Sequence, residues 1–220
     1  MAEEKIDALL ELLKQRKFTQ VYDELKEMRP EDIAPLFEQI DMQDAVKLFR
    51  LLPKSLAADT FVEMDSEHQQ KLIEAFSDTE LKAMLDEMYV DDTVDIIEEM
   101  PANVVRRILR QSDAQTRKNI NEILNYPSDS AGSIMTVEYV DLHRGMTVSK
   151  ALDHIKKTGL DKETVYTCYV IDEARHLLGV VTVKALLLAP ESRTVADIMD
   201  GTVIYCSTST DQEAVAQTFS

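Results

Sequence analysis

The chain has 220 residues, of which 45% are hydrophobic and 30% are charged, and its net charge at pH 7 is −17. This length suits two modest globular domains, and the negative charge disfavours nucleic acid and anionic membrane surfaces as partners. No apolar run approaches the roughly 18 residues of a membrane helix. Cys168 and Cys206 do not have the spacing of metal ligands, and we expect them to be reduced thiols in a cytosolic protein.

Residues 1–125 contain no glycine and have helical periodicity throughout, beginning with an expected helix over residues 6–13. An apolar residue recurs every twelve positions, and a second apolar series follows three residues later. The first series is Leu25, Phe37, Phe49, Phe61, Ile73, Leu85, Ile97 and Leu109; the second is Met28, Ile40, Leu52, Met64, Phe76, Met88 and Met100. A proline or a capping residue follows most members of the second series. We predict short helices, paired into hairpins of 24 residues, whose apolar series form the core.

Most of the negative charge lies in one part of this helical half. Between Lys54 and Arg106 there are fourteen acidic residues and only two lysines, so this segment carries −12 of the net −17. Asp91 and Asp95 share a helix face, and Asp59 occupies the same position of the twelve-residue repeat as Asp95. One interpretation is a solvated face; the other is a surface for a hard divalent cation such as Mg²⁺, which prefers carboxylates and water. We expect Asp91 and Asp95 to be exposed.

The stretch from Tyr126 to Thr136 separates two different patterns. Pro127 ends the helical half, the following serines and aspartate favour a turn, and Gly132 permits a backbone conformation that other residues avoid. After it we predict a strand over 139–142, a helix over 147–157, strands over 165–171 and 177–182, and a helix over 183–188. This is a βαββα unit.

The beginning of the βαββα unit recurs later in the chain. Ile134-Met135-Thr136 is echoed by Ile198-Met199-Asp200, and the helix that opens near Thr147 is echoed near Thr210. Residues 197–220 therefore read as the start of a second unit that stops inside its first helix. A unit without its later strands is not expected to complete a sheet.

These residues resemble a known family. The βαββα unit with Leu178-Gly179-Val180-Val181-Thr182 is similar to a CBS module, and the stretch 126–139 resembles the start of the CBS region in the MgtE family of magnesium channels. The helical repeats, with Asp91-Asp92-x-x-Asp95, resemble that family's N domain. The expected fold is therefore multidomain: an all-α superhelical repeat domain over residues 1–125, a first CBS module over 126–196, and the start of a second over 197–220.

The resemblance implies a cytosolic regulatory region that senses Mg²⁺ and controls a membrane-embedded pore. Mg²⁺ bound between the acidic helical domain and the CBS modules would favour a compact, closed state. The positions that match the family's ligands are Asp59, Asp91, Asp95, Gly132, Asp211 and Glu213. The resemblance further implies a location at the cytoplasmic face of the cell membrane, a pore domain beyond residue 220, and a homodimer formed through the CBS modules.

Two other functions fit parts of the sequence. Many CBS pairs bind adenine nucleotides, but Ala185 stands where the usual nucleotide pattern has an aspartate. The helical repeats alone also suit a scaffold that binds a protein partner. We expect no enzymatic activity, because the chain has no glycine-rich phosphate loop, no nucleophile elbow and no histidine–acid pair beside a serine or cysteine.

Overall fold

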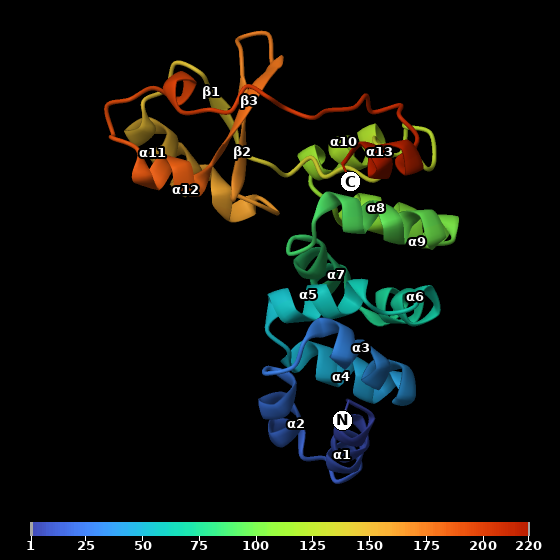
Figure 1. Cartoon of the computed structure of the whole chain (residues 1–220). Coiled ribbons are helices and arrows are strands. Elements are labelled where there is room, and N and C mark those ends of the chain that lie inside the picture. The colour runs from blue at the N-terminus through green and yellow to red at the C-terminus, as the bar shows by residue number, and fades with distance from the viewer. Residues whose placement is uncertain (1, 220) are drawn as a thin grey trace. The chain divides into compact units, whose positions relative to one another are not determined.

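The computed structural model describes residues 2–219, which form two compact units with the boundary between Asn121 and Glu122 (Figure 1). The boundary falls in the last turn of α10. The helices of the first unit, in chain order, are α1 (Ala2–Lys14), α2 (Phe18–Leu25), α3 (Pro30–Gln39), α4 (Met42–Leu51), α5 (Lys54–Val62), α6 (Ser66–Ala75), α7 (Asp78–Leu85), α8 (Val90–Glu99), α9 (Ala102–Gln111) and α10 (Ala114–Ile123). The predicted row of short helices is confirmed, with α1 longer at both ends than expected.

Local sequence signals begin these helices. Asp41 and Asp65 each accept a hydrogen bond from the backbone N–H three residues later, at 3.0 Å and 2.9 Å. Ser77 and Glu80 form the reciprocal capping box that their spacing predicts. Pro53 and Pro101 lie directly before α5 and α9, where the missing N–H of proline removes no hydrogen bond from the helix. These caps set the twelve-residue period, because each one fixes where a helix starts.

The apolar series forms the core of the first unit. Phe37, Phe49, Phe61 and Phe76 are all buried, and the ring of Phe49 lies 5.1–6.2 Å from each of the other three. Helices two apart in sequence pack together, α3 on α5, α5 on α7 and α7 on α9. This is the contact pattern expected when successive helical hairpins stack. Leu109 and the methionines at 28 and 88 are only half-buried.

One arginine ties helices that lie far apart in sequence. The guanidinium group of Arg107, on α9, donates to the backbone carbonyls of Ile73 and Phe76 and to Asp78 Oδ1. The carbonyls at a helix C-terminus lack partners within their own helix. Arg107 satisfies two of them at the end of α6 and links that end to the start of α7.

The second unit contains a three-stranded sheet of β1 (Asp141–His143), β2 (Thr167–Ile171) and β3 (Leu177–Thr182), in the order β1-β2-β3. β1 and β2 are parallel, and β2 and β3 are antiparallel. The parallel pair is connected through α11 (Val148–Thr158) and the short 3-10 helix η1 (Gly159–Asp161), and α12 (Val183–Leu188) follows β3. The sheet and these helices enclose a core of Val140, Leu142, Val148, Ala151, Cys168, Val170, Val181, Leu186 and Val195.

The predicted βαββα order is confirmed, while some boundaries were wrong. The first strand begins at Asp141 instead of residue 139, and β2 begins at Thr167 instead of 165. Each strand begins where its pairing begins: β1 at Asp141, opposite Tyr169 of β2, and β2 at Thr167, opposite Thr182 of β3. After η2 (Val195–Asp197), residues 201–207 form no strand. The helix predicted to begin the second βαββα copy is present as α13 (Gln212–Thr218).

Among the described residues, no helix combines the length and hydrophobicity that a membrane span requires.

Candidate functional site

The acidic segment between Lys54 and Arg106 contains two kinds of carboxylate. Six of the fourteen are engaged by a basic or histidine side chain: Asp65 by His68, Glu67 by Lys71, Asp78 by Arg107 and Arg110, Glu80 by Arg50, Asp86 by Lys82 and Glu87 by Lys54. By contrast, no basic side chain in residues 2–219 forms an ion pair with Asp59 or Asp95. The negative charge of this segment is therefore compensated at six acids and, within the described chain, is left without an ion pair at Asp59 and Asp95.

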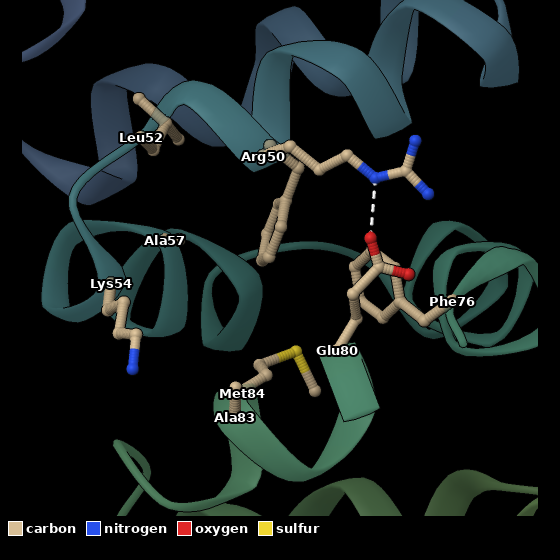
Figure 2. Close-up of a pocket in the computed structure, with 9 residues that line it drawn as sticks. Arg50, Leu52, Lys54, Ala57, Phe76, Glu80, Ala83 and Met84 are labelled. Carbon is tan, nitrogen blue, oxygen red and sulfur yellow. Dashed lines mark hydrogen bonds and ion pairs between the residues drawn. The ribbon is translucent and has the colours of Figure 1, made fainter. Parts of the chain in front are cut away.

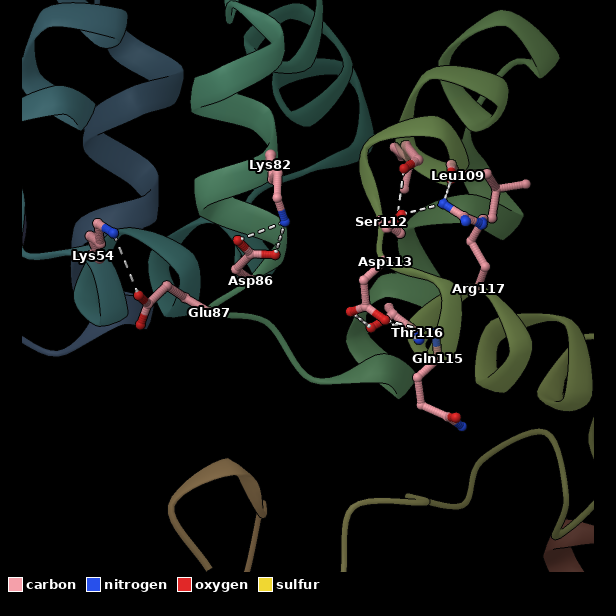
Figure 3. A network of polar contacts seen from close by, with 11 residues as sticks. Lys54, Lys82, Asp86, Glu87, Leu109, Ser112, Asp113, Gln115, Thr116 and Arg117 are labelled. Carbon is pink, nitrogen blue, oxygen red and sulfur yellow. Dashed lines mark hydrogen bonds and ion pairs between the residues drawn. The ribbon is translucent and has the colours of Figure 1, made fainter. Parts of the chain in front are cut away.

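Figure 3 shows two of the compensated acids at the end of α7. Lys82 Nζ lies 2.8 Å and 3.0 Å from the two carboxylate oxygens of Asp86, and Lys54 Nζ lies 4.0 Å from Glu87 Oε1. A lysine that already neutralises a carboxylate would have to be displaced before a metal ion could bind there. Asp86 and Glu87 are better explained as members of surface ion pairs than as metal ligands.

Helix α8 carries most of the remaining acids. Its apolar side is buried through Val94 and Ile97, which turns the opposite side outward. On that side Asp95 is exposed, as predicted, while Asp91 is half-buried, so the expectation that both are exposed was wrong for Asp91. Asp91 lies in the first turn of α8, where neighbouring residues cover part of it and the helix dipole favours a negative charge.

A hollow of about 160 Å³ lies beside α8. Three carboxylates contribute to its lining, those of Asp92, Asp95 and Glu99, together with Gln69 on α6. Gln69 is buried, and its Nε2 donates to the carbonyl oxygens at the end of α5, at 2.9 Å and 3.3 Å. Those bonds hold the amide in place, and the space beside it has room for several water molecules. The side chains are of the type that binds a hydrated Mg²⁺ ion.

Asp59 and Asp95 share an electrostatic property. Although both side chains reach the surface, neighbouring protein atoms displace part of the water around each carboxylate and raise its pKa. Glu99 raises the pKa of Asp95 further by charge repulsion. A cation placed at either residue would replace the missing hydration. Asp59 lies on α5, one turn before Val62, and is not part of the lining of the hollow that contains Asp95.

In the second unit, the 126–136 stretch is hydrogen-bonded to the segment before α13. The backbone N–H groups of Ala131 and Gly132 each donate at 2.7 Å, to the carbonyls of Thr210 and Thr208. In return the N–H of Gln212 donates to Asp129 O at 2.8 Å. We call the paired segments 129–132 and 208–212 the clasp. It brings Gly132 together with the start of the helix that carries Asp211 and Glu213.

Gly132 is required by packing and not by a turn. It is buried, no glycine in the described chain has a positive φ, and the left-handed position of this stretch is Asp129, at φ 60°. A Cβ atom at Gly132 would lie 2.4 Å from Cγ of the Tyr126 ring. The aromatic ring therefore occupies the space where any other residue would have its side chain.

Asp211 caps a helix in addition to being a predicted metal ligand. It is the N-cap of α13, and its Oδ1 accepts a hydrogen bond from the N–H of Glu213 at 2.9 Å. Both carboxylates are exposed. Across the clasp from Asp211, the hydroxyl of Ser130 is buried without a hydrogen-bond partner among the described residues.

The predicted residues thus form two sets. Asp59, Asp91 and Asp95 belong to the helical unit, while Gly132, Asp211 and Glu213 meet at the clasp. Within residues 2–219, no group of three or more acidic, histidine or cysteine side chains is close enough to form a metal cage. Sequence reasoning did not select Asp92, Glu99 and Gln69. The i, i+3 and i+7 spacing of Asp92, Asp95 and Glu99 is the signal that indicates a shared helix face.

Two family models match the chain. The model described as the MgtE intracellular N domain matches residues 28–129, and the CBS domain model matches residues 131–192. The chain is 32% identical to the magnesium transporter MgtE of Thermus thermophilus over 99% of its length, and 29% identical to the magnesium transporter MgtE of Bacillus subtilis over 97%. It spans about half the length of these relatives, 49% and 47%.

Solved structures agree with these matches. The cytosolic domain of the Mg²⁺ channel MgtE in complex with ATP aligns with a TM-score of 0.87 and 31% identity, covering 96% of this chain and 87% of that one. The soluble part of a magnesium transporter aligns with a TM-score of 0.86 and 28% identity, covering 100% and 86%. These relatives are transporters and channels, in agreement with the prediction of no enzymatic function. The chain belongs to the MgtE family, and it corresponds in sequence and fold to the cytosolic N domain and CBS region of that family's Mg²⁺ channel.

Proposed function

We propose that this chain is a Mg²⁺-sensing regulatory region of a magnesium channel or transporter. Carboxylates of the helical unit, Asp59, Asp91 and Asp95, and groups at the clasp, Gly132, Asp211 and Glu213, would share Mg²⁺ and so favour a compact, closed state. The observation that carries the proposal is the uncompensated charge on Asp59 and Asp95, in a segment where six of the other twelve acids are engaged by a basic or histidine side chain.

The proposed mechanism is electrostatic. Without a divalent cation, the acids of the helical unit repel those of the CBS region. Mg²⁺ shifts the population toward the compact arrangement only by the amount that it binds more tightly to that arrangement. The compact fraction then depends on Mg²⁺ concentration by mass action. Because Mg²⁺ usually keeps several waters and binds one or two carboxylates, it does not need a cage of three protein ligands.

The test is to titrate Mg²⁺ while the radius of gyration is followed by small-angle X-ray scattering and the cleavage near Tyr126 by trypsin. We expect compaction at millimolar Mg²⁺ and a weaker response as the pH falls toward the raised pKa values of Asp59 and Asp95, since protons compete with the cation. Sodium chloride of matched ionic strength should not compact the chain. Equal compaction by sodium would show general screening and would refute a Mg²⁺ site.

Matched variants separate the effect of losing a Mg²⁺ ligand from the effect of changing the net charge. Asp91→Ala combined with Asp95→Ala should shift the Mg²⁺ midpoint upward. Glu67→Ala combined with Asp86→Ala removes the same charge from the same unit, but these two acids are already paired with lysines. The second double variant should therefore respond like the unmodified chain. An equal shift in both would mean that only total charge matters.

The relatives extend the proposal to the whole protein. We propose that this region lies at the cytoplasmic face of the cell membrane and acts on a pore domain encoded beyond residue 220. The CBS region would pair with a second copy. Leu187 and Leu188 on α12 are exposed by 67% and 77%, which leaves apolar surface for such a contact. A concentration series by analytical ultracentrifugation tests dimer formation, and Leu188→Glu should weaken it.

An adenine nucleotide is the second candidate ligand. The favouring observation is the solved relative in complex with ATP. Against it, position 185 in the first turn of α12 is alanine, whose N–H is capped by Thr182 Oγ1 at 3.1 Å and whose side chain offers no acceptor for ribose hydroxyls. Calorimetry with ATP, in the unmodified chain and in Ala185→Asp, tests this candidate. ATP binding that appears only in Ala185→Asp would show that the alanine at position 185 prevents nucleotide binding.

A further inference from the structure

A hollow of about 220 Å³ between α4, α5 and α7 has no part in the proposed Mg²⁺ response (Figure 2). Most of its lining is apolar and consists of Phe49, Leu52, Ala57, Phe76, Ala83 and Met84. The other side chains that line it are those of Arg50, Lys54 and Glu80. An apolar interior with a few polar groups is typical of binding pockets.

The floor of the hollow is already formed. Phe49 and Phe76 are 7% and 4% exposed, and their ring centroids lie 5.1 Å apart in a tilted arrangement. Phe49 also packs edge-on against Phe61. These contacts fix the two rings before anything binds. Met84, which points into the same space, is unbranched and adapts to the shape of an occupant (Figure 2).

The charged side chains at the hollow form two ion pairs. Arg50 Nε donates to Glu80 Oε1 at 2.6 Å (Figure 2), and Lys54 Nζ lies 4.0 Å from Glu87 Oε1 (Figure 3). Each pair has a net charge of zero. These four side chains therefore do not decide whether an occupant is acidic or basic, and the charge of the surrounding surface does.

That surrounding surface is negative. Residues 54–106, which include α5 and α7, carry −12 of the net −17. Such a field attracts a basic segment and raises its rate of association. At the hollow itself Glu87 is loosely held, because 4.0 Å is too long for a hydrogen bond to Lys54. The backbone N–H of Glu87 donates to the carbonyl of Met84, which places its carboxylate within a turn of the apolar lining.

We infer that this hollow binds a basic peptide segment of a partner protein, which inserts one large apolar side chain against Phe49, Phe76 and Met84. A volume of about 220 Å³ holds a single large side chain, whereas small-molecule pockets usually measure about 300–1,000 Å³. Single aromatic anchors in desolvated pockets commonly dominate protein–protein contacts. A lysine or arginine beside the anchor would pair with Glu87, while Lys54, whose side chain is 72% exposed, would turn to solvent.

The partner that fits this chemistry is a cytoplasmic loop of a membrane-embedded domain. Such loops carry an excess of lysine and arginine, and aromatic side chains are enriched at the membrane surface next to them. The choice of partner rests on the proposed function, which places this region at the cytoplasmic face of the membrane. The binding of a basic peptide with an apolar anchor does not rest on it.

The test is the tryptophan fluorescence of the peptide Lys-Lys-Trp-Lys-Lys, titrated with the whole 220-residue chain in buffer without Mg²⁺. The chain has no tryptophan, so the emission reports on the peptide alone. We expect saturable binding and a shift of the emission to shorter wavelength, because the indole leaves water. General attraction to a chain of net charge −17 would leave the indole in water. Binding without a spectral shift would overturn the inference.

Two further peptides separate the anchor from the charge. In fluorescence anisotropy with labelled peptides, Lys-Lys-Trp-Lys-Lys should bind about tenfold more tightly than Lys-Lys-Ala-Lys-Lys, the order of magnitude for a buried aromatic anchor. The acidic peptide Asp-Glu-Trp-Glu-Asp should bind more weakly than its basic counterpart, because the surface repels it. Equal affinity of the tryptophan and alanine peptides, or preference for the acidic peptide, would contradict the inference.

Variants of the chain locate the binding. Ala83→Phe fills the hollow and should reduce the affinity for the tryptophan peptide to that for the alanine peptide, which should bind as before. Ala83→Leu is a smaller change with the same expected direction, and circular dichroism verifies that both variants are folded. An unchanged affinity for the tryptophan peptide, or an equal loss for both peptides, would refute the location.

A matched pair of glutamate variants tests the basic flanks. Glu87→Gln should weaken the binding of both basic peptides by up to about fivefold, the range for one exposed charge pair. Glu67→Gln removes the same charge from α6, where Glu67 is paired with Lys71, and should have a smaller effect. Equal effects would refute the contact with Glu87. None of these results depends on compaction by Mg²⁺, so this inference and the proposed function can fail separately.

Discussion

Replacing Glu80 with glutamine removes the charge from a carboxylate that accepts hydrogen bonds from Arg50 and from the N–H and hydroxyl of Ser77. Glu80 begins α7 as part of a capping box with Ser77 and holds Arg50 of α4 at 2.6 Å. Glutamine keeps the shape and can still accept from the Ser77 N–H, so the capping geometry survives. The ion pair between α4 and α7 is lost. Glu80→Gln therefore isolates the contribution of the charge.

The size of the effect follows from the pKa. Hydrogen bonds from Arg50 and Ser77 lower the pKa of Glu80 from 4.5 to about 2, which is equivalent to about 3 kcal/mol before solvent screening. The side chains of Glu80 and Arg50 are 32% and 52% exposed, and exposed ion pairs contribute only about 0.2–1 kcal/mol. We expect Glu80→Gln to lower the free energy of unfolding by about 1 kcal/mol at pH 7, the upper end of that range.

The pH dependence has a definite sign. Since the folded pKa lies below the unfolded one, the ionised carboxylate stabilises the fold fully above pH 4.5, and this stability is lost as the pH falls toward 2. The difference between the unmodified chain and Glu80→Gln should shrink over that interval. Urea unfolding followed by circular dichroism at 222 nm, at pH 7, 5 and 3, measures it. Arg50→Gln and the double variant complete a cycle that gives the coupling energy.

A control variant makes the reasoning refutable. Glu67→Gln removes the same charge from an i,i+4 pair with Lys71. The Glu67 side chain is 75% exposed, so this change should affect stability much less than Glu80→Gln does. If Glu80→Gln were no more harmful than Glu67→Gln at pH 7, the bridge to α4 would contribute nothing. A stability difference that stayed constant down to pH 2 would exclude the titration of Glu80 as its cause.

Further predictions concern contacts in both units. Arg107→Ala should lower stability by about 1–3 kcal/mol in urea unfolding, because two carbonyls at the end of α6 lose a charged donor. Gly132→Ala should lower the melting temperature, because its Cβ would overlap the Tyr126 ring, and adding Tyr126→Ala should recover part of the loss. With a thiol reagent at pH 8, Cys206 should react well before Cys168, whose burial raises its pKa to about 11; equal rates would contradict this.

Most of the elements could be predicted from the sequence because the signals that create them are local. Caps such as Asp65 and Ser77 act over three residues, and the twelve-residue series needs only its own period to indicate buried faces. The strands were predicted less precisely, since their ends depend on pairing with other strands, and β1 and β2 are separated by more than twenty residues of intervening chain. The candidate carboxylates of the helical unit were also visible, as an excess of acids in one segment, whereas Asp211 and Glu213 were indicated only by the resemblance to a family.

Which of those acids are available to a cation depends on tertiary structure. Glu80 is paired with Arg50, thirty residues away, and Asp78 with Arg107, twenty-nine residues away, while Asp95 has no such partner among the described residues. The clasp likewise joins Asp129 to Gln212, 83 residues apart. A sequence records the charge of each side chain, but the strength of an electrostatic interaction depends on distance and on the water displaced. Both are fixed only when segments far apart in the chain come together.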